Sequence, residues 1–311
     1  MRFPFQLLAK NDFDAVGFGT NAVDYLIRVP EYPAFNSKVE ISEYSRSAGG
    51  EIASAMVGLQ RLGLKTAYAG RFGADEAGHL GLQSLIDEGV DVTYAEISDG
   101  AQTQVAFIVI DERNGERTIL WQRDKKLVYS AIDAPAEAAV RGKILHLTPH
   151  DTAACVKMAM SARANGVVIS IDADNVFDGI EELLSLVDVC IVSAEFPEKL
   201  FGVADHKTAL REIVSRFGCG VAGLTLGKTG SIFLCEDVFI ETPGFEVPGG
   251  CVDTTGAGDA FRTGFLFGIF TGETVEESAR MANAVASLKC RGLGARSTLP
   301  DRKELMTMLG R

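Results

Sequence analysis

The stretch Asp253-Thr254-Thr255-Gly256-Ala257-Gly258-Asp259-Ala260-Phe261 decides how this chain folds and what it does. It leads from a β-type segment into a long apolar helix, expected over residues 258–271. Gly256, Ala257 and Gly258 therefore lie where a helix begins, and no large side chain shields their backbone N–H groups. Because these groups and the positive end of the helix dipole point the same way, we expect the turn to bind an anion.

Asp259 follows directly, and a carboxylate beside a bound anion repels it unless the carboxylate takes up a proton. The simplest chemistry is phosphoryl transfer, in which the turn holds the phosphate and Asp259 is the catalytic base for the attacking hydroxyl. The plainer interpretation is a glycine-rich helix start with an ordinary first-turn carboxylate. The break in regular structure at 248–250 and the second carboxylate, Asp253, favour the catalytic interpretation.

Composition narrows the class of protein. The chain has 311 residues, 47% of them hydrophobic and 23% charged, which is typical of a soluble globular protein with a large core. It carries 30 basic and 42 acidic residues without a basic cluster, which argues against a nucleic-acid partner. No stretch approaches the ~18 apolar residues of a membrane span, and no secretion signal precedes residue 10. The six cysteines form no CxxC pair, so we expect buried thiols in a cytoplasmic protein.

The pattern of elements predicts an α/β fold. From residue 143 onward, short apolar strands expected at 144–147, 167–171, 189–192 and 221–224 alternate with helices. Such alternation indicates a doubly wound, mostly parallel sheet with helices on both faces. With no linker in sight, we predict a single domain over residues 1–311.

Two amphipathic segments, about 32–47 and 97–124, fall outside this alternation. The first contains a strand expected at 38–45, and in the second Asn114-Gly115 predicts a hairpin. Together they are expected to form a small discontinuous β-sheet over the strand ends, a lid that keeps water from the phosphate. Two surface hairpins without a functional role are the alternative.

Two glycine motifs resemble nucleotide-binding loops but lack the required context. Residues 17–22 fit a dinucleotide fingerprint, yet residues 23–29 alternate like a strand where that fingerprint needs a helix. Gly227-Lys228-Thr229 resembles a P-loop, but Ala222 occupies the place of its first glycine and no helix follows. We expect a strand-to-strand turn at each, and Thr225, Gly227 and Gly230 could still let a nucleotide approach the backbone closely.

Polar residues at expected strand ends are further candidates. Asp24 lies in an apolar strand, where either ligand hydroxyls or an unseen backbone partner would compensate its carboxylate. Gly49-Gly50 precedes a helix and is either a close-approach site or a plain helix cap. Asp172 and Asp174 end one buried strand, at the edge where α/β sites lie, and Glu195 and Glu198 follow the next strand and could hold magnesium through water. Each of these carboxylates alone is more typical of a helix start or a surface group.

The motifs together closely resemble those of the ribokinase-like (PfkB) carbohydrate kinases, nearly end to end. The resemblance rests on Gly49-Gly50 and the segments 69–78, 172–175, 225–230 and, most specifically, 253–261. It implies an ATP-dependent kinase with a β-lid that often serves as a homodimer interface. It implies that Asp259 is the catalytic base and that the anion hole is formed by Gly256, Ala257 and Gly258. It further implies sugar contacts at Asp24, Gly49, Gly50 and the position of Ser54, and nucleotide contacts at Thr225, Gly227, Gly230 and Asn283. For metals it implies magnesium at Glu198 and a monovalent cation such as K⁺ at Asp253, Thr255, Gly294 and Thr298.

The chain also departs from the family pattern. Ser54 stands where the family often has asparagine, and Glu195 replaces the asparagine of the usual Asn-x-x-Glu. Segments 114–119 and 286–290 look like the ketohexose and sulfofructose kinase branch, which suggests a ketose or an acidic derivative. Five cations of the lid segment would favour an anionic sugar or simply be solvated: Arg113, Arg117, Arg123, Lys125 and Lys126.

Two other functions stay open. A nucleoside kinase would use the same machinery with a pocket large enough for a base. A non-catalytic sugar- or nucleotide-sensing protein could share the scaffold, although the presence of both Asp259 and the glycine turn argues against it.

Overall fold

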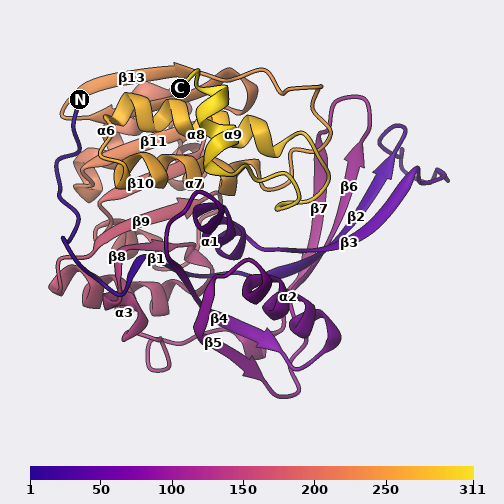
Figure 1. The fold of residues 1–311 in the computed structure, drawn as a ribbon, viewed down its shortest axis with the longest axis horizontal. Helices are drawn as coiled ribbons and strands as arrows, with labels where there is room; N and C mark the ends of the chain where they lie inside the picture. Colours follow the sequence, from indigo (N-terminus) through magenta and orange to yellow (C-terminus); the bar gives the residue numbers. More distant parts are fainter.

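A nine-stranded sheet forms the centre of the protein, which we describe from a computed structural model covering residues 1–311 (Figure 1). Its strand order is β13-β12-β11-β10-β9-β8-β1-β4-β5. The strands from β5 to β11 along this order run parallel, and β12 and β13 extend one edge in antiparallel pairing. The bounds are β1 Phe13–Phe18, β4 Thr66–Gly73, β5 Asp91–Ser98, β8 Gly142–Leu147, β9 Val168–Ala173, β10 Val189–Ser193, β11 Val221–Thr225, β12 Gly230–Cys235 and β13 Val238–Pro243.

Helices cover both faces of this sheet, as the alternating pattern predicts. One core layer lies under α3 (Thr152–Ala164), α4 (Ile180–Leu184), α5 (Phe196–Phe201) and α6 (His206–Phe217). The other lies under α1 (Glu51–Arg61), α2 (Glu76–Asp87), α7 (Ala257–Phe270), α8 (Val275–Lys289) and α9 (Arg302–Met308). Strand residues alternate between the layers, since Val16 belongs to the first and Ala15 to the second. The prediction of a doubly wound α/β fold is therefore confirmed.

A separate four-stranded sheet stands beside this body, at the right of Figure 1. Its order is β3-β2-β6-β7, with β2 Ala22–Val29, β3 Glu43–Gly49, β6 Val105–Asp111 and β7 Arg117–Gln122. Strand β2 pairs parallel with β6, and the outer pairs are antiparallel. We call this element the small sheet.

The small sheet differs from the sequence prediction in two strands. Strand β2 lies at its centre, although the predicted lid segments did not include it. The strand expected at 38–45 begins only at Glu43 and runs on to Gly49. Strand β3 begins only at Glu43 because its partner β2 ends at Val29. Pro30 has no N–H to extend the hydrogen-bond ladder, so the pairing stops at Arg28 with Glu43.

The structure confirms the strand-to-strand turns expected at the two glycine motifs, residues 17–22 and 227–229. Residues 22–29 form strand β2 and not a helix, so no helix N-terminus follows the GxGxxG-like run. Gly227–Thr229 forms a single turn of 3₁₀-helix before β12, and no P-loop helix is present.

All six cysteines are free thiols, and Cys251 alone is not buried. None of the helices combines the length and the apolar character that crossing a membrane requires. The two ends of the chain lie near each other in Figure 1, and the first residue is tied to α8 because Val275 N–H donates to the carbonyl of Met1 at 2.9 Å.

Candidate active site

A cleft of about 890 Å³ separates the carboxyl ends of the parallel strands from the inner face of the small sheet. Side chains alternate along the small sheet: Asp24, Ala106 and Ile119 face the cleft, whereas Tyr25 and Phe107 face away. The volume of the cleft lies within the range usual for small-molecule sites. This position is also where open α/β sheets bind ligands.

Eleven of the predicted site residues line this cleft: Asp24, Gly50, Thr225, Gly227, Gly230, Thr255, Gly256, Ala257, Gly258, Asp259 and Asn283. Six do not: Gly49, Ser54, Glu198, Asp253, Gly294 and Thr298. The fold thus brings together residues more than two hundred positions apart. The six others lie behind the cleft wall or on the outer surface.

The glycine turn presents backbone donors to the cleft. Gly256 has φ 75° and caps α7, and a Cβ atom there would lie 2.8 Å from Cα of Ala295. A side chain would thus meet both backbone strain and a collision. Gly256, Gly258 and Asp259 have N–H groups that donate no hydrogen bond within the chain, whereas Ala257 N–H donates to the carbonyl of Thr254 at 3.1 Å. Three unpaired donors at a helix N-terminus make a strong anion site.

The carboxyl group of Asp259 faces the same space without a hydrogen-bonding partner from the chain. Burial raises its pKa to about 7, and the charge of Asp172 adds to that rise. Arg262 acts in the opposite direction. A carboxyl group poised near neutral pH can take up a proton from a substrate.

Arg262 is a residue that the sequence analysis missed. Its guanidinium lies 2.7 Å from Asp172 Oδ1 and donates to the carbonyl of Ile191 at 3.1 Å. Burial also raises the pKa of Asp172, to about 6. The ion pair ties the first turns of α7 to the end of β9, and so fixes the helix that carries Asp259. A lone arginine in an apolar helix was the signal available in the sequence.

Asp24 lies at the other end of the cleft and is only 4% exposed. Burial raises its pKa to about 6, and no group of the chain donates a hydrogen bond to its carboxylate. Gly49 packs directly against it, because a Cβ atom at Gly49 would collide with the Asp24 carboxylate. Gly50, with φ 87°, caps α1 and reaches the cleft itself. Ser54 is buried instead, and its hydroxyl accepts a hydrogen bond from Arg296 Nε at 3.1 Å.

Thr225, Gly227 and Gly230 border the part of the cleft beyond β11. Asn283 lies beside them on α8, and its amide nitrogen is 3.1 Å from Ser231 Oγ and 3.0 Å from Thr242 Oγ1. The amide donors of Asn283 are therefore used within the protein, where they fix α8 against β12 and β13.

Several acids line the cleft, yet the structure groups no three His, Cys, Asp or Glu side chains into a metal site. Asp174 and Glu195 border the cleft, whereas Glu198 does not line it. Magnesium usually keeps several waters and binds substrate phosphates with one or two carboxylates. This arrangement therefore fits magnesium carried by a nucleotide and not a protein-only cage.

An aromatic edge and a buried acid of the cleft were also not predicted from the sequence. Trp121, His150 and Phe177 line one side of the cleft, with ring centroids 6.2 Å apart for the first pair and 5.0 Å for the second. Glu51 accepts a hydrogen bond from Thr20 Oγ1 at 3.0 Å, and burial together with neighbouring carboxylates raises its pKa well above the usual value. These residues are scattered in sequence and form no motif.

Among the five cations of the lid segment, only Arg117 lines the cleft. It donates to Thr254 Oγ1 at 3.0 Å, and Thr254 N–H donates to the carbonyl of Gly115 at 3.1 Å. The loop between β6 and β7 is thus hydrogen-bonded to the glycine turn. Arg113 and Arg123 are paired with Asp111 and Asp151.

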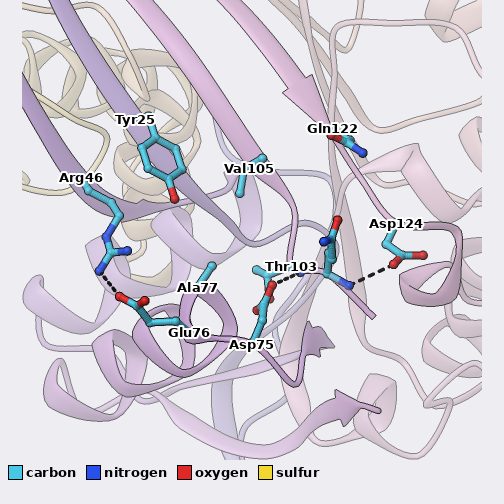
Figure 2. A pocket seen from close by; sticks show the side chains of 10 residues that line it. Tyr25, Arg46, Asp75, Glu76, Ala77, Thr103, Val105, Gln122 and Asp124 are labelled. Atoms are coloured by element: carbon cyan, nitrogen blue, oxygen red, sulfur yellow. Dashed lines mark hydrogen bonds and ion pairs between the residues drawn. The ribbon is translucent and has the colours of Figure 1, made fainter. Parts of the chain in front are cut away.

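A smaller pocket of about 300 Å³ lies on the opposite face of the small sheet (Figure 2). Its polar groups bind one another: Arg46 pairs with Glu76 at 2.6 Å, and Thr103 Oγ1 donates to Asp75 at 2.6 Å. Because its charged side chains satisfy each other, this pocket offers no unpaired charged group.

Comparison with known proteins agrees with this geometry. The model of the pfkB family carbohydrate kinases matches residues 15–302. The chain is 27% identical over 298 residues to a nucleoside kinase of Methanothermobacter thermautotrophicus, covering 95% of each protein. It is 26% identical to a ribokinase of Haemophilus influenzae, over 94% of this chain and 96% of that one.

A solved structure supports the fold. The ribokinase of Arabidopsis thaliana complexed with ribose and ATP superimposes with a TM-score of 0.81 at 24% identity, over 96% of this chain and 99% of that chain. The resemblance to the ribokinase-like (PfkB) family is thereby confirmed, whereas the resemblance to its ketohexose and sulfofructose kinase branch is not. The chain belongs to the pfkB family of carbohydrate kinases and is an ATP-dependent kinase.

Proposed function

We propose that this kinase phosphorylates a hydroxyl group of a small sugar, with Asp259 as the general base. The observation that carries the proposal is the position of the Asp259 carboxyl group directly beside three unpaired N–H donors at the start of α7. The donors of Gly256, Gly258 and Asp259 would hold the transferring phosphoryl group, and the carboxylate would accept the proton of the attacking hydroxyl. Its pKa of about 7 suits that role.

The part of the cleft beyond β11 fits the nucleotide. Bound ATP with magnesium supplies the phosphoryl group, and the backbone at Thr225, Gly227 and Gly230 would border it. Asp174 and Glu195 would bind magnesium through water. Glu198, which lies outside the cleft, has no part in this proposal.

The acceptor would lie under the small sheet. Asp24 is buried and has no donor from the chain, so hydroxyl groups of a sugar would satisfy its carboxylate. The small sheet would then act as a lid that excludes water while the hydroxyl reacts. Arg117 is the lid cation placed to favour an anionic ketose derivative.

One observation favours a nucleoside as a second candidate acceptor. The aromatic side chains Trp121 and Phe177, with His150 between them, line the cleft and could stack on a base. The nucleoside kinase named above is in addition one of the relatives of this chain.

A substrate panel tests these proposals. Purified protein with ATP and magnesium is offered ribose, fructose, fructose 6-phosphate, adenosine and inosine, and ADP release is measured. We expect one class to exceed the others by at least ~100-fold in kcat/KM, because a site built around substrate hydroxyls rejects acceptors that leave its buried polar groups unpaired. Phosphorylation of nucleosides alone would replace the sugar proposal by the nucleoside one. If none of the five compounds causes release of ADP, both the sugar and the nucleoside proposal are contradicted.

We also propose that the outward face of the small sheet joins two copies of the chain. Tyr25 and Phe107 stack there at 4.9 Å, and Phe107 and Leu120 remain 45% and 61% exposed. Contiguous exposed apolar side chains on a sheet face mark contact surfaces. Light scattering should give twice the chain mass for the wild type and the monomer mass for Leu120→Asp, whereas a monomeric wild type would contradict the proposal.

A further inference from the structure

Lys289 occupies the place behind the glycine turn where the sequence analysis expected a monovalent cation. It is the last residue of α8, and its side chain is fully buried. Its ammonium donates to the backbone carbonyl of Asp253 at 2.8 Å and lies 3.9 Å from Asp253 Oδ2. The central residue of the predicted cation loop, Asp253, therefore already faces a positive charge that belongs to the chain itself.

Most other groups of this region are also engaged, although the buried hydroxyl of Thr255 has no hydrogen-bonding partner. Asp253 is fully buried, with Oδ1 accepting from Thr255 N–H at 2.8 Å and Oδ2 from Gly294 N–H at 2.7 Å. The hydroxyl of Thr298 donates to the carbonyl of Lys289. A free alkali cation placed among these ligands would be repelled by the ammonium and would have to displace it. The residues present thus do not fit a bound K⁺.

We infer that Lys289 is a built-in replacement for the monovalent cation and that this kinase does not depend on K⁺. The ammonium balances the buried Asp253 carboxylate and holds the residue from which the turn at 254–256 begins. It thereby acts as a positioning residue for the unpaired N–H donors of Gly256 and Gly258. Its effect on turnover rests on the function proposed above, whereas its effect on cation binding does not.

The first measurement uses the ligand-free protein. Melting temperatures are compared in KCl, NH₄Cl and choline chloride at equal ionic strength for the wild type and Lys289→Ala. We expect the wild type to melt within about 1 °C in all three salts. The variant should melt lower in choline chloride and recover by roughly 2–4 °C in KCl or NH₄Cl, because a free cation then enters the vacated site. Lys303→Ala, an exposed lysine of α9, should behave like the wild type.

The second measurement follows turnover in the same salts. Wild-type kcat should vary less than about twofold between KCl and choline chloride, and Lys289→Ala should lose at least ~10-fold in choline chloride and regain part of it with NH₄Cl. A merely structural lysine would give no cation-specific recovery. If Lys289→Ala does not fold, the double variant Lys289→Met with Asp253→Asn, which removes both buried charges, takes its place and should show no response to any cation.

Three outcomes would overturn the inference. In the first, K⁺ raises wild-type turnover more than about fivefold at constant ionic strength. In the second, K⁺ specifically raises the melting temperature of the wild type. In the third, Lys289→Ala folds but responds to no cation in either measurement. An inactive wild type would refute the proposed function and leave the melting comparison to decide the inference.

Discussion

Asp253 and Asp259 flank the same glycine turn, yet the protein surrounds them in opposite ways. Asp253 lies on the core side, fully buried, with both carboxylate oxygens hydrogen-bonded and an ammonium nearby. Asp259 lies on the cleft side, where burial and the charge of Asp172 raise its pKa and no donor of the chain reaches it. One carboxylate is fully compensated and the other is left unsatisfied. The comparison teaches that residue type alone does not decide which carboxylate of a motif is reactive.

The contrast also explains how an unsatisfied acid is tolerated. Lys289 and the N–H groups of Thr255 and Gly294 fix the turn from the core side. Arg262, which pairs with Asp172, fixes the helix one turn beyond Asp259. The rigid surroundings hold Asp259 in place without satisfying it, which is the arrangement that a preorganised general base requires.

The largest expected effect comes from removing the reactive carboxylate. Asp259→Asn should lower turnover by at least ~100-fold, the scale of a lost general base, while nucleotide affinity stays within about threefold. Turnover is measured by ADP release and affinity by calorimetry. Circular dichroism provides the control for folding. Turnover within tenfold of the wild type would show that another group takes the proton.

The next effect comes from the turn between the two acids. Gly256→Ala forces an alanine into φ 75° and brings its Cβ atom within 2.8 Å of Cα of Ala295. We expect turnover to fall by roughly 10-fold or more, since the N–H donors must shift. Gly272→Ala is the matched control, because Gly272 has φ 74° with nothing near its would-be Cβ. Equal losses in the two variants would mean that strain alone, and not displacement of the donors, is responsible.

The third effect is the dependence of activity on pH. Because the general base must be ionised and the pKa of Asp259 is about 7, kcat/KM should fall about tenfold per pH unit below that value. Asp172→Asn removes a negative charge that raises this pKa and leaves Arg262 without its partner. The profile of this variant should therefore shift to lower pH. A shift to higher pH, or identical profiles, would contradict the assigned cause.

The motif at 253–261 and the alternating elements were enough to predict the fold and the glycine turn at the start of α7, since local sequence determines both. The sequence could not show whether the side chain of Asp253 lies on the core side or the cleft side of the glycine turn, because Gly294 and Lys289, which surround it, lie far along the chain. For the same reason it missed the Arg262–Asp172 pair and the aromatic edge. The bounds of β3 depended on where its partner β2 ends, which tertiary pairing decides.

The smallest effect is on stability, and its sign separates the two acids. In the folded protein the carboxyl group of Asp259 keeps its proton up to about pH 7, whereas in the unfolded chain it loses the proton near pH 4. The native protein thus binds more protons over this interval, and the stability that this group contributes is complete below pH 4 and is lost as the pH rises to about 7. Asp259→Asn avoids the loss, so at pH 8 it should melt roughly 2–4 °C above the wild type, with a smaller difference at pH 5.

The variant Asp253→Asn should melt below the wild type at pH 8, because the buried ammonium of Lys289 then loses its counter-charge. Melting curves of both variants at pH 5 and pH 8 measure the two effects together. Opposite signs at pH 8 would support the view that one acid stabilises the turn and the other is held there at a cost in stability. A lower melting temperature for both variants would mean that Asp259 is satisfied by the protein after all, and that its environment differs from that of Asp253 only in degree.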